Sequence, residues 1–494
     1  MDLTSAPIRI YHPIPPGLLD ADVVKVLRHL RRYHHEAYLV GGCVRDLLLS
    51  VTPKDFDVAT GALPREIQRI FRNSKVVGRR FRLAHIFFKN GKVIEVATFR
   101  RAPWSERGND GNGESDGDGD GDGGDGEGDG GDGEGRNGCG DEDDLLITDD
   151  NLFGTPEEDA RRRDFTINGL FYDLHTREIV DHVHGLPDVE ARVVRAIGDP
   201  DIRIQEDPVR ILRAIKFASR LELTIDPPLW QAMTRHRWEI QRSAEPRVLE
   251  EIFRLLRCNR VLAAVTLLQS SGQLEILLPE VHEHLRSAHE SQPPAPDGRL
   301  TEGAERFWRL LALLDQHIGE RGLPPDHVLL GVLLFLPLQQ ALAQTAEAVN
   351  LGKVVDELVG SVATRLRLPR RESERLRQLF ITERRLAQRR HRSGRKEALL
   401  RRPCLEEALL LHELGRRLDG EPLDRVHNLR EALARSTARG GLRPRGQGEE
   451  VEHPALPFAA EALSGHLLPA VEPLPRSRRR RPYRRRRDRD RARG

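Results

Sequence analysis

The first part of the chain alternates short apolar runs with segments of helical period. Residues 43–50 and 63–73 place apolar side chains at helical spacing, and the second segment has a proline near its start, which favours a helix beginning there. The pair Asn90-Gly91 between two apolar runs predicts a tight turn. The runs predicted to be strands are residues 36–42, 54–60, 84–89 and 93–100. This pattern indicates a mixed α/β domain.

A second folded region is expected to begin near residue 155. Thr155 and Glu158 have the spacing of a capping box, and Pro156 stands where the first helical residue would lie. Residues 166–174 and 178–183 have strand character, and after Asp199 nearly every segment has helical period. The second half of the chain is therefore predicted to be an array of helices.

These patterns predict an α/β plus α protein in successive segments. The expected boundaries are an N-terminal extension at 1–36, a mixed α/β head at 37–185, a helical neck at 186–275, a helical body at 276–435 and a tail at 436–494.

Charge is distributed very unevenly along the chain. Residues 108–144 hold 15 Asp and Glu against one Arg, and this acidic Gly/Asp insert is predicted to be disordered because it cannot bury apolar surface. From Arg476 to Gly494 there are 12 Arg and two Asp, so the tail is predicted to be disordered and basic. Because arginine matches the geometry of phosphate, a polyanionic partner is expected.

The spacing of the cysteines favours a reducing compartment, and the apolar runs bear on whether the chain crosses a membrane. Cys43, Cys139, Cys258 and Cys404 have no paired spacing, which predicts neither a zinc site nor a disulfide framework. The start of the chain lacks the pattern of a signal peptide, and the apolar run from Val328 is shorter than a bilayer span. We expect a cytoplasmic protein without a membrane partner.

Asp55 and Asp57 are the first candidates for chemistry. In a strand they would share one face while Phe56 and Val58 point to the core, and two neighbouring carboxylates repel each other unless a cation lies between them. Glu95, on another predicted strand, could add a third oxygen ligand. A few carboxylates completed by phosphate and water suit Mg²⁺. An Asp-x-Asp pair is also common as a surface turn or cap, and that alternative stays open here.

Gly41 and Gly42 end a predicted strand and open a predicted helix, and Arg45 follows one turn later. Backbone N–H groups at a helix N-terminus attract anions. A plain loop is the alternative, but together with the nearby acids this pattern predicts a phosphate beside a metal ion.

Four segments in order carry a family resemblance. Residues 39–60 ("LVGGCVRDLLL…PKDFDVAT"), 161–174 ("RRRDFTINGLFYDL"), 197–221 ("IGDPDIRIQEDPVRILRAIKFASRL") and 246–256 ("PRVLEEIFRLL") resemble the motifs of the class II RNA nucleotidyltransferases, which comprise bacterial poly(A) polymerases and CCA-adding enzymes. The resemblance covers about residues 37–257 and implies a polymerase-β-like head with a mixed sheet, followed by helical neck and body domains. Residues 71–101 and the Arg-rich tail are more similar to the poly(A) polymerase branch.

The resemblance implies a reaction and its residues. An RNA 3′-hydroxyl would attack the α-phosphate of ATP and release pyrophosphate, with two Mg²⁺ ions held by Asp55, Asp57 and Glu95. ATP and RNA 3′ ends are the expected partners, and protein partners in RNA decay are not readable from the sequence. The nucleotide-binding residues that the resemblance implies, besides the acids, are Gly41, Gly42, Arg45, Arg162, Arg163, Asp207 and Arg210.

Two residues have alternative interpretations. Asp164 would be an active-site acid by resemblance, or else the partner of a neighbouring arginine. Asp207, with Arg210, would hydrogen-bond the edge of the incoming base, but Asp207 before Pro208 also looks like a helix N-cap. The two roles of Asp207 can coexist.

Two other functions stay open. One is a CCA-adding tRNA nucleotidyltransferase, which uses the same chemistry, and the other is a non-catalytic RNA-binding protein with the same fold. The retained acids argue against the second, because a binding module has no need for carboxylates that repel each other. One departure from the family is His184, which stands where a glycine is usual.

Overall fold

The structure, a computed structural model, describes residues 6–78, 83–101, 152–291, 302–345, 351–387, 399–400, 402 and 404–438. The predicted acidic insert, Cys139 and the predicted tail beyond residue 438 lie outside these residues. The chain divides into two units, Met1–Val451 and Glu452–Gly494, and the described residues all lie in the first.

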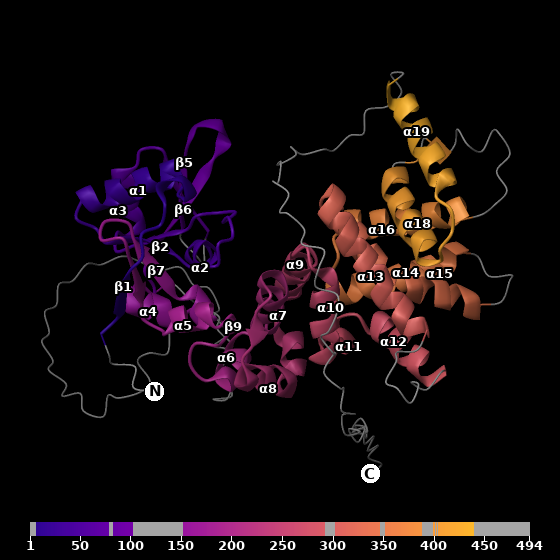
Figure 1. Ribbon diagram of the computed structural model, residues 1–494, viewed down its shortest axis with the longest axis horizontal. Helices are drawn as coiled ribbons and strands as arrows, with labels where there is room; N and C mark the ends of the chain where they lie inside the picture. Colours follow the sequence, from indigo (N-terminus) through magenta and orange to yellow (C-terminus); the bar gives the residue numbers. More distant parts are fainter. Residues whose placement is uncertain are drawn as a thin grey trace, which may run out of the picture. The chain divides into compact units, whose positions relative to one another are not determined.

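The head is built on a sheet to which eight strands contribute within the described residues (Figure 1). Their order is β1-β8-β7-β2-β3-β6-β5-β4, in which β3 and β6 run parallel and the other neighbours antiparallel. The strands are β1 (Ile8–Tyr11), β2 (Ala37–Val40), β3 (Val58–Thr60), β4 (Ser74–Val77), β5 (Leu83–Phe87), β6 (Val93–Thr98), β7 (Leu170–Asp173) and β8 (Glu178–Asp181). The predicted mixed sheet is confirmed.

Side chains alternate between the two faces of the sheet along each strand, and both faces of the central strands are buried. Leu39 joins the main core, into which α1 (Ala21–Arg32) and α3 (Pro64–Ile70) also pack. Tyr38 and Val40 join a second cluster on the opposite face, together with residues that include Phe99, Ala160 and Phe171. Ala160 belongs to α4 (Pro156–Arg161), whose predicted capping box between Thr155 and Glu158 is present.

The structure corrects two predicted boundaries in the head. Residues 1–36 are predicted to be an extension, yet β1 pairs with β8 and α1 contacts β2 and β3, so these two elements belong to the head. The strand predicted over 54–60 begins only at Val58.

His184 adopts the left-handed conformation, with φ 58° and ψ 37°. A glycine reaches this conformation without steric cost, whereas another residue costs roughly 1–2 kcal/mol. The departure from the family pattern at this position therefore strains the loop locally.

Helices make up nearly all of the neck and body, as predicted. The neck contains α5 (Gly185–Glu190), the short strands β9 (Val193–Val194) and β10 (Thr224–Ile225), α6 (Pro200–Glu206), α7 (Arg210–Leu221), α8 (Pro227–Arg235), α9 (Glu245–Leu256), α10 (Val261–Ser270) and α11 (Gln273–Leu277). The body helices are α12 (Pro279–Ser291), α13 (Glu302–Arg321), α14 (Asp326–Gln344), α15 (Leu351–Leu366), α16 (Arg370–Ala387), α18 (Leu405–Leu418) and α19 (Asp424–Ala438).

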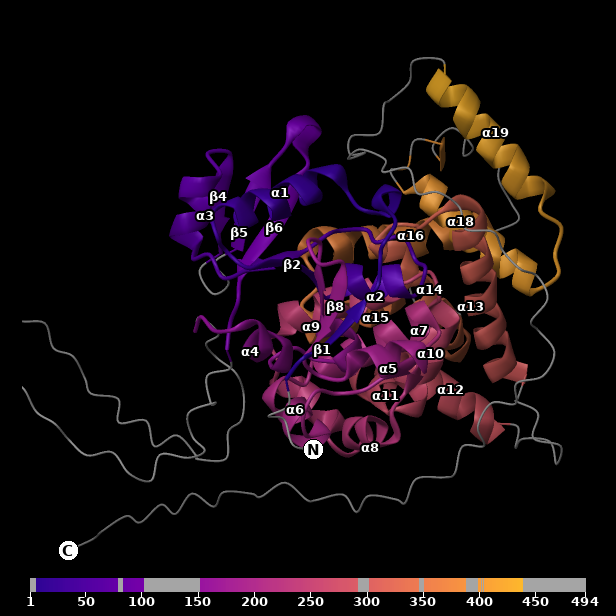
Figure 2. The same ribbon diagram turned by 60° about the vertical axis from the view of Figure 1, so that its left-hand side comes forward.

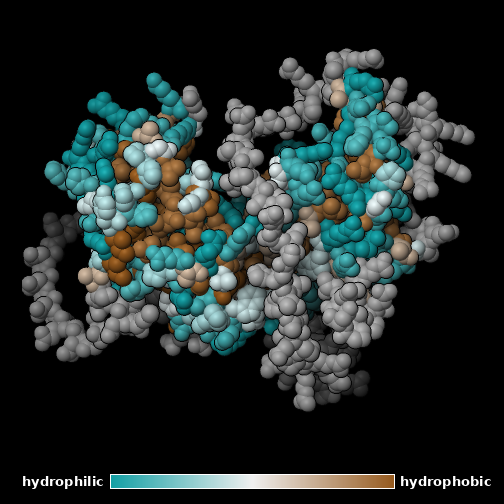
Figure 3. Space-filling view, in the orientation of Figure 1, coloured by the Kyte–Doolittle hydropathy of each residue, from teal (hydrophilic) through white to brown (hydrophobic). Residues whose placement is uncertain are grey.

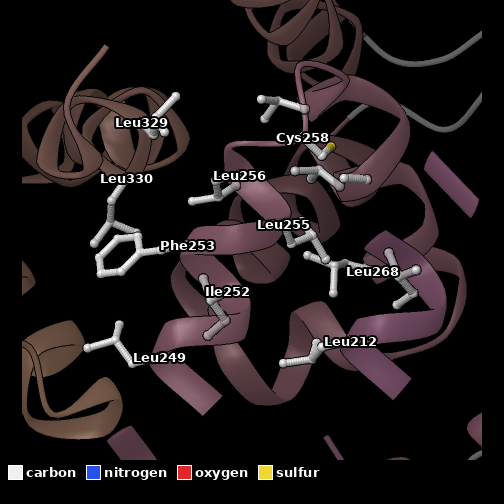
Figure 4. Close-up of a cluster of buried hydrophobic side chains, with 14 of the residues drawn as sticks. Leu212, Leu249, Ile252, Phe253, Leu255, Leu256, Cys258, Leu268, Leu329 and Leu330 are labelled. Carbon is white, nitrogen blue, oxygen red and sulfur yellow. The ribbon is translucent and has the colours of Figure 1, made fainter. Parts of the chain in front are cut away.

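Helix α9 joins the neck to the body. Figure 4 shows Phe253 of α9 directed at Leu330 of α14, while Leu255 points toward Leu268 of α10 on the other side. All four side chains are buried. In both ribbon views α13 lies beside α12 and α18 (Figures 1 and 2).

Helix α14 extends beyond the apolar run from which it was predicted. Of the described helices, α14 is the one whose length and apolar composition would allow it to cross a membrane. Every residue from His327 to Leu338 is nevertheless buried within the helical body. Figure 3 shows a largely hydrophilic visible surface over α13, α18 and α19, whereas hydrophobic residues gather over β2, β7 and α2 (Gly42–Leu48) of the head.

Candidate active site

Gly41 forms the turn between β2 and α2, and it must be a glycine for two reasons. Its φ of 71° with ψ of −127° is a conformation that other residues rarely adopt. A Cβ atom at Gly41 would also lie 2.8 Å from a terminal nitrogen of Arg163. The N–H group of Gly41 donates to the carbonyl of Leu170 at 3.1 Å, so the prediction of a bare N–H group is wrong for Gly41 itself.

Asp55 and Asp57 lie in the loop that leads into β3, not inside a strand as predicted. The alternation nevertheless holds, because both aspartates are exposed while Phe56 between them packs partly against the core. The carbonyl of Asp57 accepts a hydrogen bond of 3.1 Å from the N–H of Val40. Asp57 is thereby tied to β2 one residue before the strand pairing of β3 begins.

Glu95 lies beside Asp57 because β3 and β6 run parallel with Val58 opposite Val96. The pKa of Asp57 is raised, first because the surrounding protein desolvates its carboxylate and then because Glu95 and Asp55 repel it, with Arg163 partly offsetting this repulsion. The structure therefore places Glu95 and Asp55 close enough to Asp57 for their charges to repel it. Within the described part of the chain, no three His, Cys, Asp or Glu side chains are grouped so that they could hold a metal ion.

Arg162 and Arg163 both pair with Asp159 of α4. A terminal nitrogen of Arg162 lies 2.7 Å from one carboxylate oxygen of Asp159, and one of Arg163 lies 2.8 Å from the other. Burial alone would raise the pKa of Asp159, but the two arginines hold it below its ordinary value. Arg163 also stacks over Phe171, with 5.4 Å between the guanidinium carbon and the ring centre. Its charge therefore lies beside Gly41 and close enough to Asp57 to lower the pKa of that carboxylate.

Asp164 forms an ion pair, but with Arg213 of α7 and not with a neighbouring arginine. The shortest distance between the two groups is 2.7 Å, and Asp164 is only 7% exposed. Asn168 donates to the same carboxylate at 2.9 Å. Although burial would raise the pKa of Asp164, these partners lower it. Asp164 therefore joins the head to the neck, and its proposed role as an active-site acid is untested.

Arg45 is buried beneath the site. It donates to Asp46 at 2.9 Å and to the side-chain oxygen of Asn168 at 2.6 Å, and its guanidinium lies 4.7 Å from the centre of the Phe217 ring. Desolvation lowers its pKa. In this arrangement Arg45 packs the head against α7. Its predicted contact with the nucleotide is untested.

Asp207 and Arg210 lie where α6 ends and α7 begins. The interpretation of Asp207 as an N-cap is wrong, since the cap position of α7 is Val209 and no side chain caps this helix. One oxygen of Asp207 instead lies 2.5 Å from Arg247 of α9, while Oδ1 is buried without a hydrogen-bond partner. Arg210 donates to Glu206 at 2.9 Å and to the carbonyl of Arg203 at 2.6 Å.

Sequence reasoning missed the partners that hold these groups, namely Asp159, Arg213, Arg247 and His85. Arg213 had a local signal, since it follows Arg210 by one helical turn. His85 and Arg247 had none, because each meets its carboxylate partner only through the pairing of strands or the packing of helices.

Comparisons with known proteins identify the family to which the chain belongs. Residues 37–195 match the family "Poly A polymerase head domain", and residues 222–285 match "Probable RNA and SrmB- binding site of polymerase A". The chain is 32% identical over 423 residues to poly(A) polymerase I of Salmonella typhi, covering 82% of this chain and 80% of that protein. It is 37% identical over 279 residues to that of Haemophilus influenzae, covering 56% of each chain.

CCA-adding enzymes are similar over a shorter length. The enzyme of Lactobacillus johnsonii is 31% identical over 231 residues, which cover 47% of this chain and 48% of that protein. Among solved structures, the CCA-adding enzyme of Bacillus stearothermophilus in complex with CTP matches with a TM-score of 0.57 and 22% identity, covering 86% of this chain and 83% of that one. This structural likeness supports the fold alone.

Proposed function

Because this chain belongs to the class II RNA nucleotidyltransferases and is similar over most of its length to poly(A) polymerase I, we propose that it adds AMP from ATP to RNA 3′ ends without a template. The observation that carries this proposal is the meeting of Asp57, Glu95 and Arg163 beside the Gly41 turn. A polynucleotide adenylyltransferase needs positive charge here to hold a triphosphate and negative charge to hold the metal ions that accompany it.

The acids fit the magnesium ions that such a reaction uses. Asp55, Asp57 and Glu95 provide only oxygen ligands. Desolvation first, and then repulsion by Glu95 and Asp55, raise the pKa of Asp57, and a divalent cation bound there would stabilise its carboxylate. When bound there, Mg²⁺ would stabilise charge on the attacking and leaving oxygens.

The remaining groups would hold the nucleotide. Arg163 would contact the triphosphate, together with backbone N–H groups at the start of α2. The free oxygen of Asp207 would accept a hydrogen bond from the amino group of adenine, while Arg210, whose guanidinium is fixed by Glu206 and the carbonyl of Arg203, would donate to a ring nitrogen. With the base held in this way, the RNA 3′-hydroxyl would attack the α-phosphate and pyrophosphate would leave.

A CCA-adding activity is the second candidate, because cytosine also presents an amino group beside a ring acceptor and CCA-adding enzymes match half of the chain. The longer match to poly(A) polymerase I favours the first candidate.

The test supplies the protein with a short unstructured RNA or a tRNA lacking its terminal CCA, with each nucleotide alone and with ATP and CTP together. We expect a ladder of adenosines on the unstructured RNA and poor use of CTP. Addition of two cytidines and one adenosine to the tRNA alone would instead identify a CCA-adding enzyme. The Asp57→Asn variant is the control for both activities, and a non-catalytic binding protein would leave both RNAs unextended.

A further inference from the structure

A row of polar side chains crosses the sheet beside the candidate active site. Lys75 of β4 is opposite His85 of β5, and His85 is opposite Glu95 of β6. The parallel register of β3 and β6 continues this row to Asp57. Residues directly opposite each other in neighbouring strands have interacting side chains. The row therefore connects the candidate metal ligand Glu95 to His85, a residue that the proposed chemistry does not use.

Apolar pairs flank this row on the same face. Leu83 is opposite Val77 on one side, and Phe87 is opposite Val93 on the other. His85 thus stands between two apolar pairs, and its side chain is only 25% exposed. An imidazole has two side-chain torsions, so a ring enclosed in this way has few orientations available.

His85 and Glu95 are in contact. Nε2 of His85 lies 3.5 Å from Oε1 of Glu95, whose side chain is 51% exposed. Glu95 has a longer side chain and more solvent around it, so without a partner it would sample several rotamers. Repulsion from Asp57 would favour those that carry its carboxylate away from the acids. An N–H group at Nε2 of this ring, 3.5 Å from Oε1 of Glu95, would attract the carboxylate and oppose that movement.

We propose that His85 is a positioning residue that holds the carboxylate of Glu95 beside Asp57, so that the site presents three oxygen ligands together. This inference rests on the proposed metal-dependent nucleotidyl transfer at the same site. In this inference His85 does not contact the nucleotide or the RNA, and His85 acts only through Glu95.

The test compares His85→Ala and His85→Gln with the wild-type protein. The side-chain amide of glutamine can donate a hydrogen bond to Glu95, whereas alanine cannot. Ile10→Ala is the control, since Ile10 is a 41% exposed side chain of the same sheet, on β1, which does not neighbour β5 in the strand order. Binding of Mn²⁺ to each protein is measured by calorimetry with a non-hydrolysable ATP analogue present, and binding of the analogue alone is measured in EDTA.

We expect His85→Ala to weaken Mn²⁺ binding about 10-fold, at the low end of the roughly 10- to 100-fold range for removing a partner of a metal ligand. Binding of the analogue in EDTA should be unchanged, His85→Gln should regain most of the metal affinity, and Ile10→Ala should match the wild type. The Mg²⁺ concentration for half-maximal AMP addition should rise in parallel in His85→Ala.

Equal Mn²⁺ affinity in wild type and His85→Ala would overturn the inference, as would an equal loss in His85→Ala and Ile10→Ala. These results are independent of the RNA substrate. If the wild type extends no RNA but His85→Ala still loses metal affinity and His85→Gln regains it, the proposed function fails while the positioning role stands. If the wild type polymerises and the variants bind Mn²⁺ alike, only the positioning role fails.

Discussion

At the scale of single residues, Gly41 shows how an absent side chain makes room for a charged one. The guanidinium of Arg163 occupies the space where a Cβ atom of residue 41 would lie, and Asp159 and Phe171 hold it there. The turn and the arginine therefore form one unit, although they are more than 100 residues apart in the chain.

Gly41→Ala should accordingly damage both stability and nucleotide binding. The backbone conformation costs a non-glycine residue about 1–3 kcal/mol, and the new methyl group would displace Arg163. We expect a lower midpoint of thermal unfolding and weaker binding of ATP. Gly91→Ala is the control, because Gly91 also has positive φ but no atom lies within 4 Å of the place that a Cβ atom would take there. That variant should lose stability and still bind ATP, and equal ATP affinity in all three proteins would contradict the role given to the Gly41 turn.

At the scale of elements, helix α10 receives its N-terminal cap from another helix. Its own cap residue, Arg260, provides no side-chain hydrogen bond. Asp315 of α13 instead accepts hydrogen bonds from the N–H groups of Val261 at 2.7 Å and Leu262 at 3.0 Å. Burial raises the pKa of Asp315 to about 6, although these two hydrogen bonds oppose the shift.

Asp315→Ala should therefore destabilise the protein by about 1 kcal/mol, since two N–H groups lose their acceptor. Asp315→Asn keeps an acceptor and removes the titration. Between the ordinary pKa of 3.8 and about 6 the folded protein keeps a proton that the unfolded chain has released, so the wild type loses stability as pH rises through this window. The difference in unfolding midpoint between wild type and Asp315→Asn, measured from pH 4 to pH 7, should show this loss. A constant difference would contradict the assigned titration.

At the scale of the whole molecule, α7 holds the head against the neck through arginines on one face. Arg213 pairs with Asp164 at 2.7 Å, and two turns later Arg220 pairs with Asp46 at 3.1 Å. The same helix begins with Arg210, so these ion pairs also orient the residues proposed to bind the base relative to the head.

Arg213→Met should cost about 2 kcal/mol, less than the roughly 3–5 kcal/mol for breaking a fully buried pair, because the Arg213 side chain is 34% exposed. Adding Asp164→Asn should restore part of this loss, since it removes the unpaired charge. Because Arg213 lowers the pKa of Asp164, its stabilisation is present above the ordinary pKa of 3.8 and is lost as pH falls through the lowered value. Thermal unfolding of the single and double variants measures both effects. Additive losses in the double variant would show that the two groups do not interact.

The basic end of the chain leads to a prediction about RNA binding. Deleting residues 476–494, which hold 12 Arg and two Asp, should weaken binding of RNA of any sequence and flatten its dependence on salt, because fewer counterions are released from the phosphates. Replacing the same arginines with lysines should preserve the salt dependence. The slope of log affinity against log salt concentration is the measurement, and an unchanged slope after deletion would show that this segment does not contact RNA.

Local patterns in the sequence were sufficient for the elements and for part of the site. The capping box at Thr155 and Glu158, the helices from α6 onward and the shared orientation of Asp55 and Asp57 depend on residues a few positions apart, whose spacing directly determines backbone conformation. The same spacing placed the start of β3 too early, because a strand begins where a partner is available, and here that is at Val58.

Only the tertiary structure decided which charges neutralise one another. Asp164 meets Arg213, Asp207 meets Arg247, and His85 meets Glu95 because helices pack and strands align in one register. Each candidate site residue has many oppositely charged residues available in a chain in which 32% of residues are charged, and composition cannot choose among them. The choice depends on distance in the folded state, since Coulomb interaction and hydrogen bonding are effective only over a few ångströms.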